Sequence, residues 1–182
     1  MIEITVAQTP EHIKGILELQ AANSRAVLTE EELSQEGFVT VKHSEALLRQ
    51  MIDFVPQVIA LDNGLVTGYV LAMDKRMAPH IPELRGMFAV LDVLPYQEGV
   101  IADHPFIVCG QACVHKDYRG RALLDRMYFK MKELFSASQR FCITEIAVSN
   151  TRSQRVHERV GFNTIHRYQD DLEDWNIVQW KW

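Results

Sequence analysis

The chain has 182 residues, of which 47% are hydrophobic and 24% are charged, values typical of a globular domain. A chain of this length buries roughly 70% of the surface that it exposes when unfolded, so it can form a core without disulfides or a structural metal. The 19 lysines and arginines against 24 acidic residues give a net charge of −5, without the basic excess of nucleic-acid-binding proteins. We therefore expect a single domain over residues 1–182 and no nucleic-acid partner.

The cysteines and the apolar segments indicate the compartment. The chain has three cysteines, an odd number, and none of them forms a CxxC pair: Cys109, Cys113 and Cys142. Cys109 and Cys113 fall on one expected strand, where four residues separate their Cα atoms by ~13 Å, beyond disulfide reach. No segment approaches the ~20 apolar residues of a membrane span, and the N-terminal segment does not resemble a signal peptide. We therefore expect a cytoplasmic protein with no membrane partner.

The first half of the chain predicts a strand followed by helices and a hairpin. Apolar residues alternate over 2–6, which indicates a strand, and Thr9-Pro10 then begins a helix. Two more helices are expected, over 29–37 and over 44–54, each of which starts with a residue that can cap a helix. An Asp-Asn-Gly turn at 62–64 lies between two apolar runs, and therefore predicts an antiparallel hairpin over 58–73.

The second half predicts buried strands that alternate with helices. Residues 75–104 contain three prolines between apolar pieces, so we expect irregular structure with short helices there. After it, in chain order, we expect a strand buried on both faces at 106–114, an amphipathic helix at 124–135, a parallel strand at 141–148, a helix from Asn150 to Gly161, and strands at 162–168 and 176–182. This order predicts an α/β domain with a mixed sheet.

The junction between the strand at 106–114 and the following helix has the features of an anion site. The first N–H groups of a helix have no intrahelical partner and lie at the positive end of its dipole. Arg119 and Arg121 add charge, and Gly120 lets the backbone approach a ligand closely. The same residues also occur in ordinary basic turns, so the junction alone does not decide between the two interpretations.

Two polar residues share a face of the helix that follows Asn150. Ser153, Val156, His157 and Val160 recur at helical spacing, which places them on one stripe. Ser153 and His157 are candidates for a site, but Ser153 could equally bond to the backbone and His157 could be a hydrogen-bonded core histidine.

Taken together, the segments HKDYRGRALL, EIAVSN and SQRVHERVGF resemble the GNAT superfamily of acyl-CoA-dependent N-acetyltransferases. The family signature R/Q-x-x-G-x-G/A falls on Arg119 to Leu124, where Ala122 and Leu124 replace its two small residues. The resemblance covers residues 105–168. It implies a single-domain, mixed and splayed α/β (α+β) sheet flanked by helices, with acetyl-CoA or another short acyl-CoA between the strands 105–114 and 141–148.

The resemblance also assigns site residues. It implies that the backbone around Gln111, Ala112, Cys113 and Val114 binds pantetheine and polarises the acetyl carbonyl. It places the pyrophosphate against Arg119, Gly120, Arg121, Ala122, Leu123 and Leu124, and the pantetheine arm against Asn150 and Ser153. His157 falls where the family most often has the tyrosine that protonates the departing thiolate, a role open to histidine.

Glu145 resembles the carboxylate that some protein N-terminal acetyltransferases of the family use as a base. An apolar environment would raise its pKa toward the working pH of a base. The alternative is a carboxylate held by backbone or arginine contacts at the end of the strand. The expected acceptor is a small-molecule amine or a peptide amine, and the resemblance allows for a homodimer.

Other functions have weaker support. His157-Glu158 begins an HExxH-like string, but Gly161 occupies the second histidine position, so we expect no metal. Cys113 and His115 share a strand face, which permits a thiol nucleophile with a nearby base. A CoA-binding regulatory module without catalysis is the main alternative to an enzyme. The acidic residues Glu30, Glu31, Glu32 and Glu36 and then Asp170, Asp171, Glu173 and Asp174 form either solvated surfaces or an entrance that attracts a cationic amine.

Overall fold

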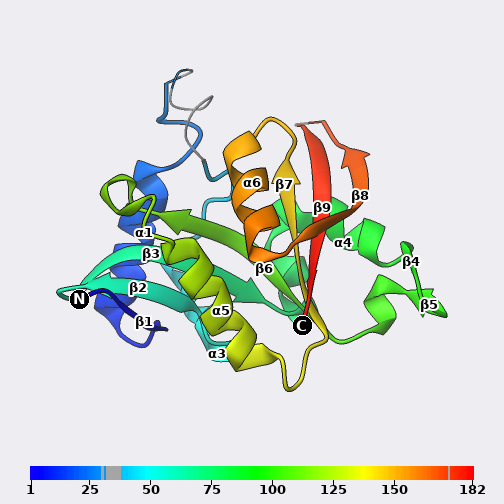
Figure 1. Cartoon of the computed structure of the whole chain (residues 1–182), viewed down its shortest axis with the longest axis horizontal. Helices are drawn as coiled ribbons and strands as arrows, with labels where there is room; N and C mark the ends of the chain where they lie inside the picture. The colour runs from blue at the N-terminus through cyan, green and yellow to red at the C-terminus, as the bar shows by residue number, and fades with distance from the viewer. Residues whose placement is uncertain (30, 32–37, 172) are drawn as a thin grey trace.

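A seven-stranded mixed sheet forms the centre of the computed structural model, which describes residues 1–29, 31, 38–171 and 173–182 (Figure 1). In sheet order the strands are β1 (Glu3–Val6), β2 (Val58–Asp62), β3 (Leu65–Met73), β6 (Phe106–Val114), β7 (Phe141–Ala147), β9 (Asp174–Lys181) and β8 (Asn163–Gln169). Neighbouring strands are antiparallel except β6 and β7, which are parallel. The expected mixed sheet, antiparallel in its N-terminal half, is confirmed.

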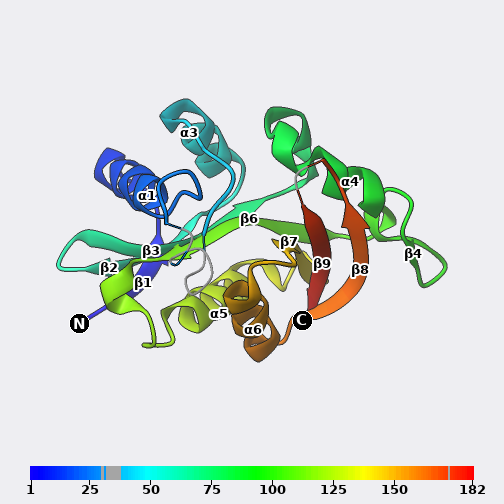
Figure 2. The ribbon, with the colours of Figure 1, turned by 90° about the horizontal axis from the view of Figure 1, so that it is seen from above.

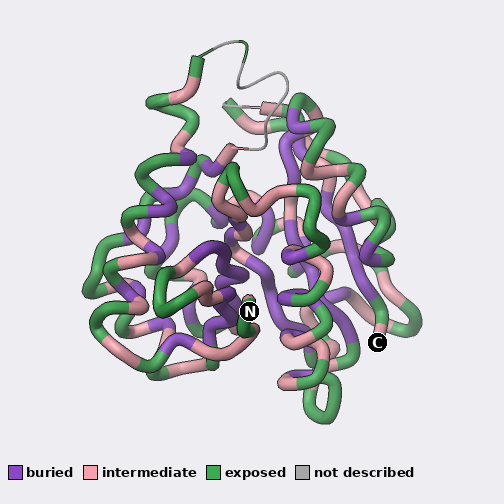
Figure 3. The backbone as a smooth tube through the Cα atoms, turned by 60° about the vertical axis from the view of Figure 1, so that its left-hand side comes forward, coloured by how far each residue is buried: buried purple, intermediate pink, exposed green. Residues whose placement is uncertain are grey.

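Helices cover both faces of this sheet (Figure 2). One face carries α1 (Pro10–Ala22), α3 (Glu45–Phe54) and α4 (Arg85–Leu91), and the other carries α5 (Leu123–Phe135) and α6 (Thr151–Val160). Strand β6 contributes Phe106 and Val108 to the hydrophobic cluster of the first face, and Ile107 and Cys109 to that of the second. It is therefore buried on both faces, as its continuous apolar sequence predicts, and buried residues follow the inner strands while exposed residues follow the outer turns (Figure 3).

Short local signals determine where the helices begin and end. The side chains of Thr9, Ser44 and Asn150 each accept a hydrogen bond from a backbone N–H in the first turn of the helix that follows, at 3.3, 3.1 and 3.1 Å. Gly161 ends α6 with a φ of 119°, a left-handed conformation that glycine adopts without a Cβ clash. None of the described helices combines the length and the apolar composition that a membrane span requires.

The hairpin of β2 and β3 closes through a two-residue turn. Asn63 and Gly64 have φ values of 50° and 82°, which matches the twist of antiparallel strands.

The expected helix over 29–37 lies almost entirely outside the described residues. Strand β9 starts at Asp174, two residues earlier than expected, so the connection from β8 is shorter than the acidic segment suggested.

Residues 75–104 consist of short elements, as their prolines predict. In chain order these are the 3₁₀ turns η1 (Lys75–His80) and η2 (Pro82–Leu84), helix α4, a ribbon of β4 (Pro95–Tyr96) and β5 (Gly99–Val100), and the 3₁₀ turn η3 (Ile101–Asp103). The apolar segment at 86–94 contains most of α4, one of the expected short helices, and buries Met87, Phe88 and Leu91. The β4–β5 ribbon was not expected.

The sheet opens between β6 and β7. The two strands pair only where Phe106–Val108 faces Phe141–Ile143, whereas β7 pairs with β9 along its whole length. The cause lies at Gly110, where β6 has an extra residue opposite β3, because Leu71 pairs with Gln111 and Ala72 with Cys109. Such a bulge bends a strand and interrupts its pairing. A Cβ on Gly110 would lie 2.0 Å from Cε of Met73, so any other residue there would force the end of the Met73 side chain to move.

Candidate active site

Two adjoining cavities occupy the opening between β6 and β7. The larger has a volume of about 750 Å³ and extends from β6 to the N-terminal ends of α5 and α6. The smaller has a volume of about 80 Å³ and extends to Glu145 on β7. Both are lined by Ala112, Ser153 and His157, so the two cavities are neighbours at the centre of the site.

The structure brings together nearly all the residues that the sequence singled out. The larger cavity is lined by Ala112, Cys113, Val114, Arg119, Gly120, Ala122, Leu123, Leu124, Asn150, Ser153 and His157, and the smaller one by Gln111, Ala112, Glu145, Asn150, Ser153 and His157. Arg121 is the exception, because it lines neither cavity and its guanidinium lies over the ring of Tyr118 at 5.2 Å.

The chain enters α5 through two residues with left-handed backbone conformations. Gly120 has a φ of 77° and Ala122, the residue before the helix, has a φ of 54°. Ala122 stands where the family signature has glycine, and its backbone retains the conformation that glycine favours. No side chain caps this helix, so its first N–H groups face the larger cavity without a capping partner from the described residues. The junction therefore has the geometry of an anion site.

The positive charge of the larger cavity comes mainly from α6. Arg119 donates from Nη2 to Oδ1 of Asn23 at 2.6 Å and from Nε to the carbonyl of Val114 at 3.2 Å, so much of its guanidinium is used to hold the chain. Burial, with a contribution from nearby Arg152, lowers the pKa of Arg119. Arg152, Arg155 and Arg159 also line this cavity. The sequence shows this set at i, i+3 and i+7 of one helix, a spacing that our sequence analysis did not use.

One of these arginines links the two helices that border the cavity. Arg159 donates to both carboxylate oxygens of Asp125 at 2.9 and 2.6 Å, and this contact lowers the pKa of Asp125. A two-point arginine–carboxylate contact fixes geometry more firmly than a single one. It therefore joins α5 to α6 beside the larger cavity.

His157 is hydrogen-bonded through both ring nitrogens. Nδ1 lies 2.8 Å from the carbonyl of Ser153, which can only accept, so Nδ1 carries the proton. Nε2 then accepts from the hydroxyl of Tyr128 at 2.6 Å. Burial lowers the pKa of His157 to about 4, so the ring is neutral at pH 7. Tyr128, a fully buried residue of α5, is a member of the site that our sequence analysis missed.

Glu145 contacts a tyrosine at the far side of the smaller cavity. Burial raises the pKa of its carboxyl to about 7, Asp170 contributes in the same direction, and a hydrogen bond from Tyr168 opposes them. The Tyr168 hydroxyl donates to Oε2 at 2.5 Å. At neutral pH a group with this pKa exists in comparable amounts as acid and as carboxylate, which suits proton transfer.

The side chain of Gln111 holds the wall of the smaller cavity in place. Its Oε1 accepts from Tyr69 at 2.6 Å and from Gln20 at 2.9 Å, and its Nε2 donates to the carbonyl of Val41 at 2.7 Å. These bonds fasten Val41 to β6 and join α1 to the same side chain. Phe38 and Val39, which precede Val41, line both cavities.

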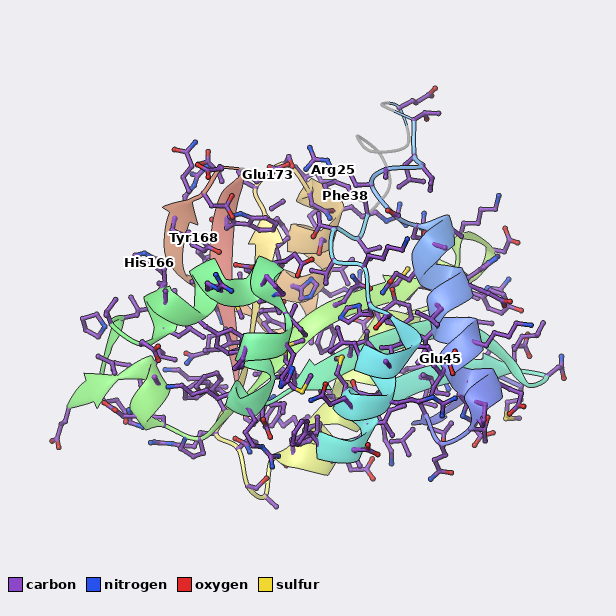
Figure 4. All side chains as sticks on the ribbon, turned by 180° about the vertical axis from the view of Figure 1, so that it is seen from behind. Arg25, Phe38, Glu45, His166, Tyr168 and Glu173 are labelled. Atoms are coloured by element: carbon purple, nitrogen blue, oxygen red, sulfur yellow. The ribbon has the colours of Figure 1, made fainter. Side chains whose placement is uncertain are left out.

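A cluster at the outer end of the site fixes the same wall from the other side. Arg25 donates to Glu173 at 2.6 Å, and the hydroxyl of Ser149 contacts both oxygens of that carboxylate at 2.9 and 3.0 Å. The guanidinium of Arg25 also lies over the ring of Phe38 at 5.2 Å. Figure 4 shows Arg25 and Phe38 next to Glu173, although they come from distant parts of the chain.

The alternative chemistries receive no support from these residues. Burial raises the pKa of the Cys113 thiol to about 12, which leaves almost no thiolate for nucleophilic attack at neutral pH. His115 is paired with Asp117 at 3.8 Å. Within the described ranges, no group of three or more His, Cys, Asp and Glu side chains could hold a metal ion.

No family model matches the chain, and neither does any curated protein. Solved structures match it over its whole length. A chain of the NatC complex bound to Gag peptide and CoA is 15% identical, with a TM-score of 0.68 over 100% of this chain and 98% of that one. The ribosomal-protein-S18-alanine N-acetyltransferase of Escherichia coli is 14% identical, with a TM-score of 0.65 over 100% and 94%. A GNAT-family acetyltransferase of Streptococcus agalactiae is 12% identical, with a TM-score of 0.64 over 100% and 95%. The chain therefore has the fold of the GNAT acetyltransferases, as the residues of its second half predict.

Proposed function

We propose that the protein is an N-acetyltransferase that transfers an acetyl (short acyl) group from acetyl-CoA to a primary amine by direct attack. The observation that carries this proposal is the connection between the two cavities. The larger ends at an uncapped helix start with arginines nearby, and the smaller contains a carboxyl with a pKa of about 7. These features support an anion site and a base in one opening of the sheet.

The residues of the larger cavity fit CoA. The phosphates would lie against Gly120 to Leu124 and the arginines of α6, and the pantetheine arm between β6 and α6, where Asn150 and Ser153 line the wall. Beyond Val108, β6 does not pair with β7 in the described structure, so its backbone is available to hold the acetyl carbonyl. When bound, acetyl-CoA supplies a thioester whose acetyl group is open to attack by an amine.

Glu145 would serve as the base. It removes a proton from the amine nitrogen, directly or through a water chain, as that nitrogen forms its bond to the acetyl carbon and the bond to sulfur breaks. His157 would return a proton to the sulfur. Because its ring is neutral, it has only the Nδ1 proton to give, and that proton must first leave the Ser153 carbonyl. A neutral imidazole donates with less driving force than an imidazolium.

The double hydrogen bonding of His157 also supports a second candidate, a CoA-binding regulatory module without catalysis. Thiol release from acetyl-CoA with a panel of primary amines, combined with calorimetry of CoA binding, separates the two. Amine-dependent release that is lost in Glu145→Gln supports the enzyme. Tight CoA binding without release supports the module. Equal affinity for CoA and for pantetheine without phosphates contradicts the anion site on which both depend.

A further inference from the structure

The contact between Tyr168 and Glu145 joins two strands that are not neighbours in the sheet. Strand β9 lies between them, and Ile177 of β9 pairs with Glu145 on one side and with His166 on the other. Tyr168 is two residues beyond His166, so its side chain leaves the same face of the sheet as Glu145. The phenol then extends across β9 to place its hydroxyl 2.5 Å from Oε2 of Glu145.

Helix α4 leaves space for this tyrosine at Gly86. A Cβ at that position would lie 3.1 Å from the Tyr168 hydroxyl oxygen and 3.2 Å from Cε2 of its ring. Glycine is unfavourable inside a helix. Gly86 does not have a positive φ, so its backbone conformation does not explain why glycine occupies this position. The close packing of Tyr168 is a sufficient reason. Figure 4 shows Tyr168 on β8 next to α4.

We propose that Tyr168 is a positioning residue for the base Glu145, and that Gly86 of α4 keeps it in place. The hydroxyl holds Oε2, stabilises the ionised carboxylate, and leaves Oε1 to accept the proton of the amine. This inference rests on the proposed acetyl transfer, because it assigns Tyr168 a part in that reaction. Tyr168 acts through Glu145 and has no contact with the acceptor in this role.

The direction of the effect follows from the groups around Glu145. Asp170 from the turn after β8 disfavours its ionised form, and so does burial, whereas the Tyr168 hydroxyl favours it. Cys109 of β6 and His157 of α6 also line the smaller cavity. Both are uncharged at pH 7, because burial raises the pKa of the Cys109 thiol to about 12 and lowers that of His157 to about 4. Tyr168 is therefore the main group that holds the carboxylate in its ionised form.

The variant Tyr168→Phe removes the hydroxyl and keeps the ring. The pKa of Glu145 should then rise, so the acidic limb of the kcat–pH profile should move upward by roughly 1–2 pH units, as the loss of a hydrogen bond to a charged group implies. At pH 7, kcat should fall about 5- to 50-fold, because less of Glu145 is ionised, and it should recover at a pH above the pKa that Glu145 has in the variant. Gly86→Ala should shift the limb in the same direction, because its methyl group displaces Tyr168.

The carboxyl titration of Glu145 supplies a readout that does not depend on activity. Carbon-13 NMR of glutamate-labelled protein follows this titration, and Glu145→Gln identifies the signal. We expect the midpoint to rise in Tyr168→Phe and to stay in place in the control Tyr96→Phe, which removes a hydroxyl from the distant β4–β5 ribbon. An unchanged midpoint and an unchanged limb in folded, active Tyr168→Phe overturn the proposal. A lack of transfer by the unmodified protein, with the midpoint still moved by Tyr168→Phe, overturns the proposed function instead.

Discussion

The hydroxyl of Tyr128 lies 2.6 Å from Nε2 of His157, and both side chains are buried. The Sγ atom of Cys109 lies 3.2 Å from the same hydroxyl. A buried polar group that loses its partner destabilises a protein by about 1–3 kcal/mol, whereas the removal of both partners is nearly neutral. The pair therefore has a structural role that can be separated from the proposed role of His157 in the reaction.

Two variants separate these roles. His157→Phe should reduce the free energy of unfolding, because it leaves Tyr128 without its partner, and the double variant His157→Phe/Tyr128→Phe should regain part of the loss. If His157 is the general acid, kcat should fall by roughly 10²–10⁴-fold in both variants while CoA affinity is retained. Urea denaturation, steady-state kinetics and calorimetry measure the three quantities. An unchanged kcat would leave His157 with a structural role alone.

Stability should depend on pH through the same histidine. The pKa of His157 is lowered from 6.5 to about 4, so below pH 6.5 the unfolded chain binds a proton that the folded chain does not. The free energy of unfolding should therefore fall as the pH drops from 6.5 toward 4, by at most about 3 kcal/mol from this group. His43, also buried with a pKa of about 4, should contribute in the same direction.

Glu145 should change the stability in the opposite direction. Its raised pKa stabilises the fold below pH 4.5, and this contribution disappears as the pH rises through about 7. A comparison between the unmodified protein and His157→Phe isolates the contribution of the histidine. Urea denaturation at several pH values should show a shallower decline for His157→Phe than for the unmodified protein. Equal slopes would contradict a buried neutral ring at this position.

The left-handed conformation of Ala122 gives a prediction about stability. An alanine at a φ of 54° is strained, whereas glycine is not, so Ala122→Gly should raise the free energy of unfolding by ~0.5–1 kcal/mol and leave CoA affinity intact. Gly120→Val is the matched test at a φ of 77°, where a β-branched residue should lower both stability and CoA affinity. Thermal unfolding without ligand, followed by calorimetry, measures both. A destabilised Ala122→Gly would show that this backbone conformation carries no strain.

The acidic residues after β8 give a prediction about the acceptor. Glu173 is paired with Arg25 and Asp174 with Arg167, at 2.6 and 3.6 Å, so these two carboxylates are partly neutralised. The run also contains Asp171 and Asp170, and Oδ1 of Asp170 accepts a hydrogen bond from the backbone N–H of Glu173 at 2.9 Å. If they attract a cationic amine, kcat/KM should fall as ionic strength rises, and charge reversal at both positions should remove this dependence. A preference for neutral or anionic amines would contradict the attraction and leave acetyl transfer untouched.

Local signals account for the parts of this structure that the sequence predicts. The caps at Thr9, Ser44 and Asn150 and the turn at Asn63-Gly64 act within a few residues, so their outcome can be inferred from neighbouring letters. The strand–helix–strand order at 106–147 can also be inferred from patterns within each segment. The fold was therefore predictable wherever the structure depends on short-range chemistry.

The partners of the site residues depend on distant parts of the chain. Tyr168 reaches Glu145 because the sheet order β7-β9-β8 places β8 one strand away from β7. Tyr128 reaches His157 because α5 and α6 lie on the same face of the sheet. Gly110 lies against the methyl group of Met73 on the neighbouring strand. No spacing within one segment reports such contacts, so the sequence suggested the site residues without the groups that tune them.

The most direct test of the account is the pH dependence of amine-dependent CoA release, measured for the unmodified protein and for Glu145→Gln. CoA release should require both acetyl-CoA and an amine. In the unmodified protein its rate should fall below about pH 7, and in Glu145→Gln both this pH dependence and most of the rate should be lost. CoA binding without release for any amine of a broad panel, at any pH at which the protein is folded, would contradict it.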